Sequence, residues 1–105
     1  MARILHVDDD SSWRGIVKRA LEEAGHQVVS LSTLPQAQQA YQAGGFDLVV
    51  CDGTLDKKAS EAGVRWAEAL HAQGQKTVVL SGWAKTEVPC VLKGLFDPEQ
   101  LLALL

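Results

Sequence analysis

Polar side chains that can bind a cation or a phosphoryl group follow the apolar runs of this sequence. Asp8 and Asp9 follow the first run, Asp52 the third, Ser81 the fourth and Lys93 the fifth. Three carboxylates held together repel one another unless a cation neutralises them, and hard oxygen ligands suit Mg²⁺. A hydroxyl and an ammonium group beside them would stabilise the oxygens of a phosphoryl group. The spacing therefore predicts a Mg²⁺-assisted phosphoryl site with a carboxylate nucleophile.

The elements that must position these residues follow from the hydrophobic pattern. Apolar runs predict strands at 3–7, 27–31, 47–51, 76–80 and 88–92. Helical spacing predicts helices at 13–24, 35–43, after the loop 53–60 through residue 70, and at 97–105. Strands alternating with helices indicate an α/β fold with a parallel sheet covered by helices. Ligands bind at the carboxyl ends of such strands, so we expect the polar residues to meet there.

The first helix has two features that bear on the acidic cluster. Ser11 or Ser12 is expected to cap it, and its apolar face is predicted to include Trp13 and Ile16. Negative charge is favourable near a helix N-terminus. We therefore interpret Asp10 as a residue that stabilises this helix, and Asp8 and Asp9 as candidate functional residues.

Several other residues that do chemistry in some proteins have a plainer interpretation here. The three histidines lack partners at metal-ligand spacing and are interpreted as structural or solvent-facing: His6, His26 and His71. Trp13 and Trp66 lie on helical apolar faces and are expected in the core. Cys51 and Cys90 lie in apolar runs and are expected to be buried, reduced thiols.

Length and composition limit the possible functions. The chain of 105 residues fits one domain, 1–105, and 47% hydrophobic residues are typical of a soluble protein. Its net charge of -3 and the lack of Lys or Arg clusters argue against direct binding of nucleic acid. The apolar stretches are too short to span a membrane. No signal peptide precedes the first strand, so a cytoplasmic location is expected.

Four segments of the sequence resemble the signature segments of response regulator receiver domains, in the order that the family has them. They are ILHVDDD at 4–10, FDLVVCD at 46–52, VVLSG at 78–82 and VLK at 91–93. Together they span nearly the whole chain. The resemblance implies a flavodoxin-like, doubly wound sheet of five parallel strands in the order 2-1-3-4-5.

The resemblance also implies roles for individual residues. Asp52 corresponds to the phosphoacceptor, Ser81 to the hydroxyl that bonds the phosphoryl group, and Lys93 to its ion-pair partner. Family members take the phosphoryl group from a histidine kinase or a phosphotransfer protein. They catalyse only their own phosphorylation and dephosphorylation, so the chain is not expected to be an enzyme in the usual sense.

A magnesium site is part of the same resemblance. Asp9 and Asp52 correspond to direct Mg²⁺ ligands, with Asp8 acting through water. The backbone carbonyl of Thr54 would supply a further ligand.

The sequence departs from the family pattern after the predicted fourth strand. Residues 82–87 are too few for the helix that usually joins strands 4 and 5, since a parallel crossover takes about a dozen residues or more. This helix is expected to be missing or reduced to a loop. Cys90 stands where an aromatic switch residue is common, and Gly94 replaces a proline. Trp83 either covers the resulting gap or contacts a partner, and the covering role is favoured.

These departures favour signalling by changed protein association, with a possible homodimer through the region around strands 4 and 5. One alternative is a degenerate receiver that acts as a phosphorylation-independent interaction module. A more distant alternative is a haloacid-dehalogenase-like phosphatase, because residues 50–54 resemble its Asp-x-Asp-Gly-Thr motif. The nucleophile position of that motif is occupied by Val50.

Overall fold

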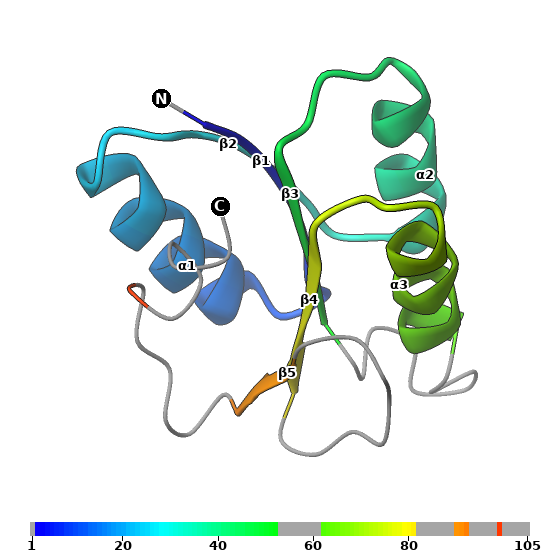
Figure 1. The fold of residues 1–105 in the computed structure, drawn as a ribbon. Coiled ribbons are helices and arrows are strands. Elements are labelled where there is room, and N and C mark those ends of the chain that lie inside the picture. Colours follow the sequence, from blue (N-terminus) through cyan, green and yellow to red (C-terminus); the bar gives the residue numbers. More distant parts are fainter. Residues whose placement is uncertain (1, 53–61, 82–89, 93–98, 100–105) are drawn as a thin grey trace.

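The computed structural model describes residues 2–52, 62–81, 90–92 and 99 (Figure 1). For residues 52, 62, 63, 81 and 90–92 it describes the backbone only. The elements in chain order are β1 (Arg3–Val7), α1 (Ser11–Glu23), β2 (Gln27–Leu31), α2 (Leu34–Gln42), β3 (Leu48–Asp52), α3 (Ala62–Ala72), β4 (Thr77–Ser81) and β5 (Cys90–Leu92). None of these helices combines the length and apolar composition needed to cross a membrane.

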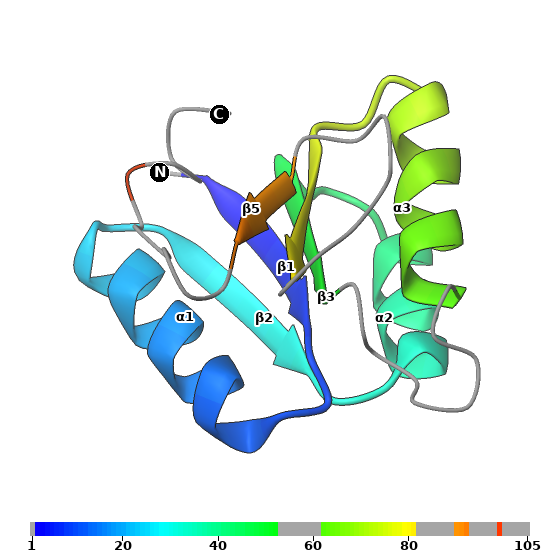
Figure 2. The same cartoon turned by 90° about the horizontal axis from the view of Figure 1, so that it is seen from below.

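The strands form one parallel sheet in the order β2-β1-β3-β4-β5, in which β5 is a three-residue strand beside β4. Helix α1 lies on one face of the sheet, and α2 and α3 lie on the other (Figures 1 and 2). The predicted α/β class, with a parallel sheet of flavodoxin-like type, is confirmed.

The boundaries differ from the predicted ones in a way that matters for the site. Strands β1 and β2 have the predicted bounds, whereas β3 and β4 each lie one residue later than predicted. Asp52 and Ser81 are therefore the last residues of their strands rather than the residues that follow them. Strand β5 begins two residues later than predicted. The helix before β5 that is expected to be missing would lie within 82–89, which are outside the described residues. Of the last predicted helix, 97–105, only Glu99 is described, and it is helical.

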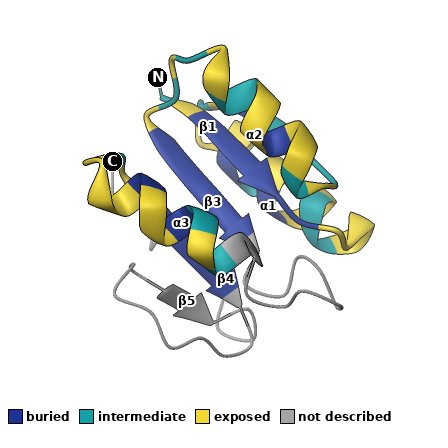
Figure 3. Ribbon diagram, turned by 90° about the vertical axis from the view of Figure 1, so that its right-hand side faces the viewer, coloured by how far each residue is buried: buried dark blue, intermediate teal, exposed yellow. Residues whose placement is uncertain are grey.

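The core lies on both faces of the sheet, as the continuous apolar runs of β1, β3 and β4 require. Toward α1, a cluster contains Ile4, Val17, Leu21, Val28, Leu48, Val50, Val78 and Leu80. Toward α2 and α3, two clusters contain Val7, Ala37, Cys51, Ala67 and Val79, and Leu5, Val49 and Leu70. Figure 3 shows the buried strands between helices whose outer surfaces are exposed. These layers fix the strands whose ends carry the candidate site.

Helix α1 corrects one sequence prediction. Val17 and Leu21 are fully buried and Trp13 packs against their cluster, but Ile16 is 49% exposed. Successive residues of a helix are rotated by about 100°. With Val17 and Leu21 at the centre of the buried stripe, Ile16 therefore lies at its side, and its predicted place on the apolar face is wrong.

Substitutions in α1 test this orientation of the helix. We expect Leu21→Ala to lower the free energy of unfolding by about 2–5 kcal/mol, because it leaves a cavity in the core. Ile16→Ala is the matched control and should change it by less than about 0.5 kcal/mol. Urea unfolding followed by circular dichroism measures both. Equal losses for the two variants would contradict the observed rotation of α1.

Candidate functional site

The register of the parallel sheet brings the candidate residues to one edge. Val7 pairs with Cys51, so the backbone of Asp8 continues beside that of Asp52. Asp52 in turn pairs with Leu80, the residue before Ser81. Neighbouring strands lie about 4.8 Å apart. The backbones of three predicted site residues, from β3, β4 and the end of β1, therefore lie side by side.

The remaining predicted site residues are described less completely. Ser81 pairs with Leu92, and Lys93 directly follows Leu92 in the sequence. Lys93 and Thr54 lie outside the described residues, as do the side chains of Asp52 and Ser81. Among the predicted site residues, the structure therefore describes the side chains only of Asp8 and Asp9, at the end of β1.

Asp8 and Asp9 have different surroundings at this end of β1. Asp8 is fully buried, and its amide donates a hydrogen bond of 3.0 Å to the carbonyl of Leu31 on β2. Its Oδ1 atom accepts a hydrogen bond of 2.9 Å from the amide of Asp10. Asp9 is exposed. A buried carboxylate is costly unless it is hydrogen-bonded or neutralised. The hydrogen bond from the amide of Asp10 stabilises the carboxylate of Asp8 within this turn.

Asp10 begins helix α1. Its backbone is extended, and its Oδ1 atom accepts hydrogen bonds from the amides of Ser12 at 2.8 Å and Trp13 at 3.3 Å. This is the geometry of an N-cap, which satisfies amides that have no partner within the helix. The predicted cap at Ser11 or Ser12 is wrong, because the carboxylate of Asp10 already reaches these amides. The interpretation of Asp10 as a helix-stabilising residue is confirmed.

Arg14 contacts the same turn and was not singled out from the sequence. Its Nη1 atom donates a hydrogen bond of 2.8 Å to the carbonyl of Asp8, and its amide donates one of 2.9 Å to the carbonyl of Asp10. The only signal in the sequence is a positively charged residue about one helical turn after the aspartates. We interpret Arg14 as part of the site.

The donor set fits a hard divalent cation. Asp8 and Asp9 offer carboxylate oxygens on adjacent residues, and the backbone of Asp52 lies beside them. Oxygen ligands with room for water are the preference of Mg²⁺. Among the described residues, no three His, Cys, Asp or Glu side chains are grouped as metal ligands. The predicted set instead combines Asp8 and Asp9 with ligands on Asp52 and Thr54.

The residues given a structural interpretation have structural surroundings. His6 is buried on β1, with its Nδ1 atom 3.4 Å from the hydroxyl of Ser30, and His26 accepts a hydrogen bond from the amide of Ala2. Trp13 and Trp66 are partly buried against the core, as predicted. Cys51 is a buried free thiol, which confirms its prediction. The side chain of Cys90 lies outside the described part of the chain.

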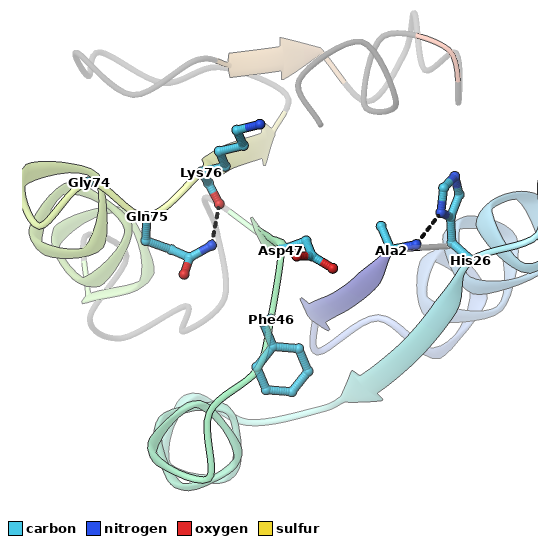
Figure 4. Close-up of a pocket in the computed structure, with 7 residues that line it drawn as sticks. All are labelled: Ala2, His26, Phe46, Asp47, Gly74, Gln75 and Lys76. Atoms are coloured by element: carbon cyan, nitrogen blue, oxygen red, sulfur yellow. Dashed lines mark hydrogen bonds between the residues drawn. The ribbon is translucent and has the colours of Figure 1, made fainter.

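A hollow lies at the opposite edge of the sheet, at the amino ends of the strands. Figure 4 shows the residues that line it: Ala2, His26, Phe46, Asp47, Gly74, Gln75 and Lys76. Its polar atoms join neighbouring segments of the chain. Asp47 accepts a hydrogen bond of 2.8 Å from the amide of Arg3, and His26 accepts one of 2.9 Å from that of Ala2. We interpret this hollow as a junction of loops, remote from the candidate site.

Comparison with known proteins agrees with this arrangement. The family model described as the response regulator receiver domain matches residues 4–96. This match spans β1 from Ile4 onward, the elements α1 to α3 and β2 to β5, and all of the predicted site residues.

Solved structures give the same result for the fold. The Vibrio cholerae chemotaxis protein CheY4 is 26% identical, with a TM-score of 0.78 over 98% of this chain and 94% of the other. The Thermotoga maritima response regulator TrrA, in complex with Mg²⁺ and BeF, is 24% identical, with a TM-score of 0.81 over the whole of both chains. A Burkholderia pseudomallei response regulator with a phosphorylated aspartic acid and a calcium ion is 20% identical, with a TM-score of 0.79 over 100% of this chain and 66% of the other.

The cap of α1 can be tested separately from the chemistry of the site. We expect Asp10→Ala to lower the free energy of unfolding by about 0.5–2 kcal/mol, because the amides of Ser12 and Trp13 lose their acceptor. Asp10→Asn keeps an acceptor and should lose much less. Ser12→Ala should be nearly neutral. A larger loss of stability for Ser12→Ala than for Asp10→Ala would contradict the Asp10 cap and support a cap by Ser12. Urea unfolding of the three variants measures these differences.

Proposed function

The chain belongs to the response regulator receiver domain family, and on that basis we propose that it is a phosphoacceptor in two-component signal transduction. It acts as a single domain over 1–105, and Asp52 receives the phosphoryl group. The observation that carries this proposal is the register of the sheet, in which the end of β1 and the ends of β3 and β4 are neighbours. This register supports a site that combines an acidic turn, an acceptor and a hydroxyl.

The proposed reaction is a transfer between two side chains. A carboxylate oxygen of Asp52 attacks the phosphorus of a phosphohistidine on the partner, and an acyl phosphate bond forms as the P–N bond breaks. The electron pair of that bond returns to the imidazole nitrogen. The hydroxyl of Ser81 and the ammonium group of Lys93 bind the phosphoryl oxygens. Later attack by water on phosphorus releases phosphate and restores Asp52.

Mg²⁺ is the proposed cofactor, held by Asp9 and Asp52 directly, by Asp8 through water and by the carbonyl of Thr54. When bound, it would neutralise the acidic cluster and the charge of the phosphoryl oxygens. Oxygen donors on Asp8 and Asp9 at the end of β1 support this assignment. A structural neighbour from Thermotoga maritima was solved in complex with Mg²⁺ and BeF.

The proposed partners are a histidine kinase or phosphotransfer protein that supplies the phosphoryl group, and a protein that receives the signal. We place the changed association, including a possible homodimer, in the region of β4 and β5. These strands pair in parallel although only residues 82–89 join them, fewer than a helical crossover takes. Such a short connection supports an output surface that differs from the usual one.

A second candidate function is that of a degenerate receiver, which associates with partners without phosphorylation. The short connection before β5, and a cysteine at position 90, favour this alternative. Mg²⁺ affinity distinguishes it from the first candidate. The phosphatase alternative needs a nucleophile at position 50, but Val50 is fully buried in the core. Turnover of a generic phosphoester would be its signature.

Phosphorylation at Asp52 is directly measurable. We expect acetyl phosphate with Mg²⁺ to add one phosphoryl group to the native chain, seen in its intact mass, and to add none to Asp52→Asn. Omission of Mg²⁺ should abolish the adduct, because the acidic cluster then stays unneutralised. An unmodified native chain that also fails to bind Mg²⁺ would favour the interaction module.

The proposed change in association can be measured by sedimentation. We expect beryllofluoride with Mg²⁺, a mimic of the phosphoryl group, to shift the native chain from monomer toward dimer. Asp52→Asn under the same conditions is the control and should not shift. The same monomer with and without the mimic would contradict signalling through a homodimer.

A further inference from the structure

We propose that Arg14 is a positioning residue for Mg²⁺ binding, because its guanidinium holds the peptide plane that precedes Asp9. The inference deepens the proposed function and rests on it. It comes from two contacts of one residue: the guanidinium bonds the carbonyl of Asp8 at 2.8 Å, and the amide bonds the carbonyl of Asp10 at 2.9 Å.

These contacts act on rigid units. A peptide bond is planar, so the carbonyl of Asp8 and the amide of Asp9 belong to one plane. The guanidinium of Arg14 holds this plane from outside the turn. The next plane contains the amide of Asp10, which donates to the Oδ1 atom of Asp8 at 2.9 Å. The third contains the carbonyl of Asp10, which accepts from the amide of Arg14.

Both peptide planes that flank Asp9 therefore have hydrogen bonds, one from the side chain of Arg14 and one to the carboxylate of Asp8. The next plane is held by the backbone amide of Arg14, a bond within the helix. Only φ and ψ of Asp9 relate the first plane to the second, so fixing both planes fixes the direction in which its side chain leaves the backbone. An aspartate whose flanking peptide planes lack such support would sample more directions and lose more entropy on binding a cation. The entropy cost of orienting Asp9 is thus met when the protein folds, before a cation binds.

The guanidinium also brings a positive charge to an acidic turn, and this charge has the opposite effect. By Coulomb's law, a cation close to a Mg²⁺ site weakens binding, whereas a better-oriented ligand strengthens it. Removing the side chain of Arg14 therefore lowers Mg²⁺ affinity if positioning dominates and raises it if charge dominates. We expect positioning to dominate, because the guanidinium already bonds the carbonyl of Asp8 in a partly buried position.

The helix provides a matched control. Arg19 lies on the same helix with a side chain that is 83% exposed, and its contact is an ion pair of 3.3 Å with Glu23. Arg14→Met and Arg19→Met remove the same charge and keep an apolar stem, but only the first removes a donor to the turn. Arg14→Lys keeps the charge and one donor. Arg14→Gln is a second neutral variant, in case Arg14→Met does not fold.

The experiment is a calorimetric Mg²⁺ titration of the unphosphorylated protein and these variants, with Asp9→Asn as a ligand-loss reference. We expect Arg14→Met and Arg14→Gln to bind Mg²⁺ about tenfold or more weakly, as for other supports of metal ligands. Arg14→Lys should recover most of the affinity, and Arg19→Met should stay within about twofold of the native chain. Urea midpoints in EDTA identify any loss that reflects the stability of the fold alone.

Two outcomes overturn the inference in distinguishable ways. If the native chain binds Mg²⁺ and Arg14→Met and Arg14→Gln bind it as well as or better than Arg19→Met does, Arg14 is not a positioning residue, and the proposed function stands. If neither the native chain nor any variant binds Mg²⁺, the proposed function itself fails, and the role of Arg14 fails with it.

Discussion

The parallel pairing of β1 with β3 is the constraint on which the rest of the structure depends. Its register places Val7 beside Cys51, and therefore the acidic turn beside Asp52. A slip of one residue would send each side chain to the opposite face of the sheet. Ile4 and Leu5 would then exchange the core clusters on the two faces. Each cluster would then receive side chains of a different shape, so complementary packing on both faces of the sheet holds the site in register.

Much of the fold could be predicted from the sequence because its signals are local. Strands β1 and β2 are apolar runs with clear limits, and their bounds were predicted without error. The hydrophobic pattern predicts the ends of β3 and β4 one residue too early, because Asp52 and Ser81 are polar residues that still pair within the sheet. The place of Ile16 depends on how α1 rotates against the sheet, which hydrophobic spacing alone did not fix.

The site was predicted less completely, for a physical reason. Residue type and strand position are enough to place Asp8 and Asp9 at the edge of the sheet. The cap of α1 was assigned to serines, because the sequence does not say which of several neighbouring oxygens reaches the free amides; in the structure it is that of Asp10. Arg14 acts through a hydrogen bond from its side chain to a backbone carbonyl, and such a contact leaves no repeating pattern in the sequence.

The acidic turn belongs to the site and to helix α1 at once. The amide of Asp10 donates to the carboxylate of Asp8, Asp10 caps the helix, and the guanidinium of Arg14 donates to the carbonyl of Asp8. Groups that share one network do not contribute independently to stability. Substitutions of Asp8, Asp10 and Arg14 are therefore expected to be epistatic, so the effect of each depends on which of the others is present. These three positions are expected to diverge through coordinated changes, whereas the exposed face of the same helix is free to vary.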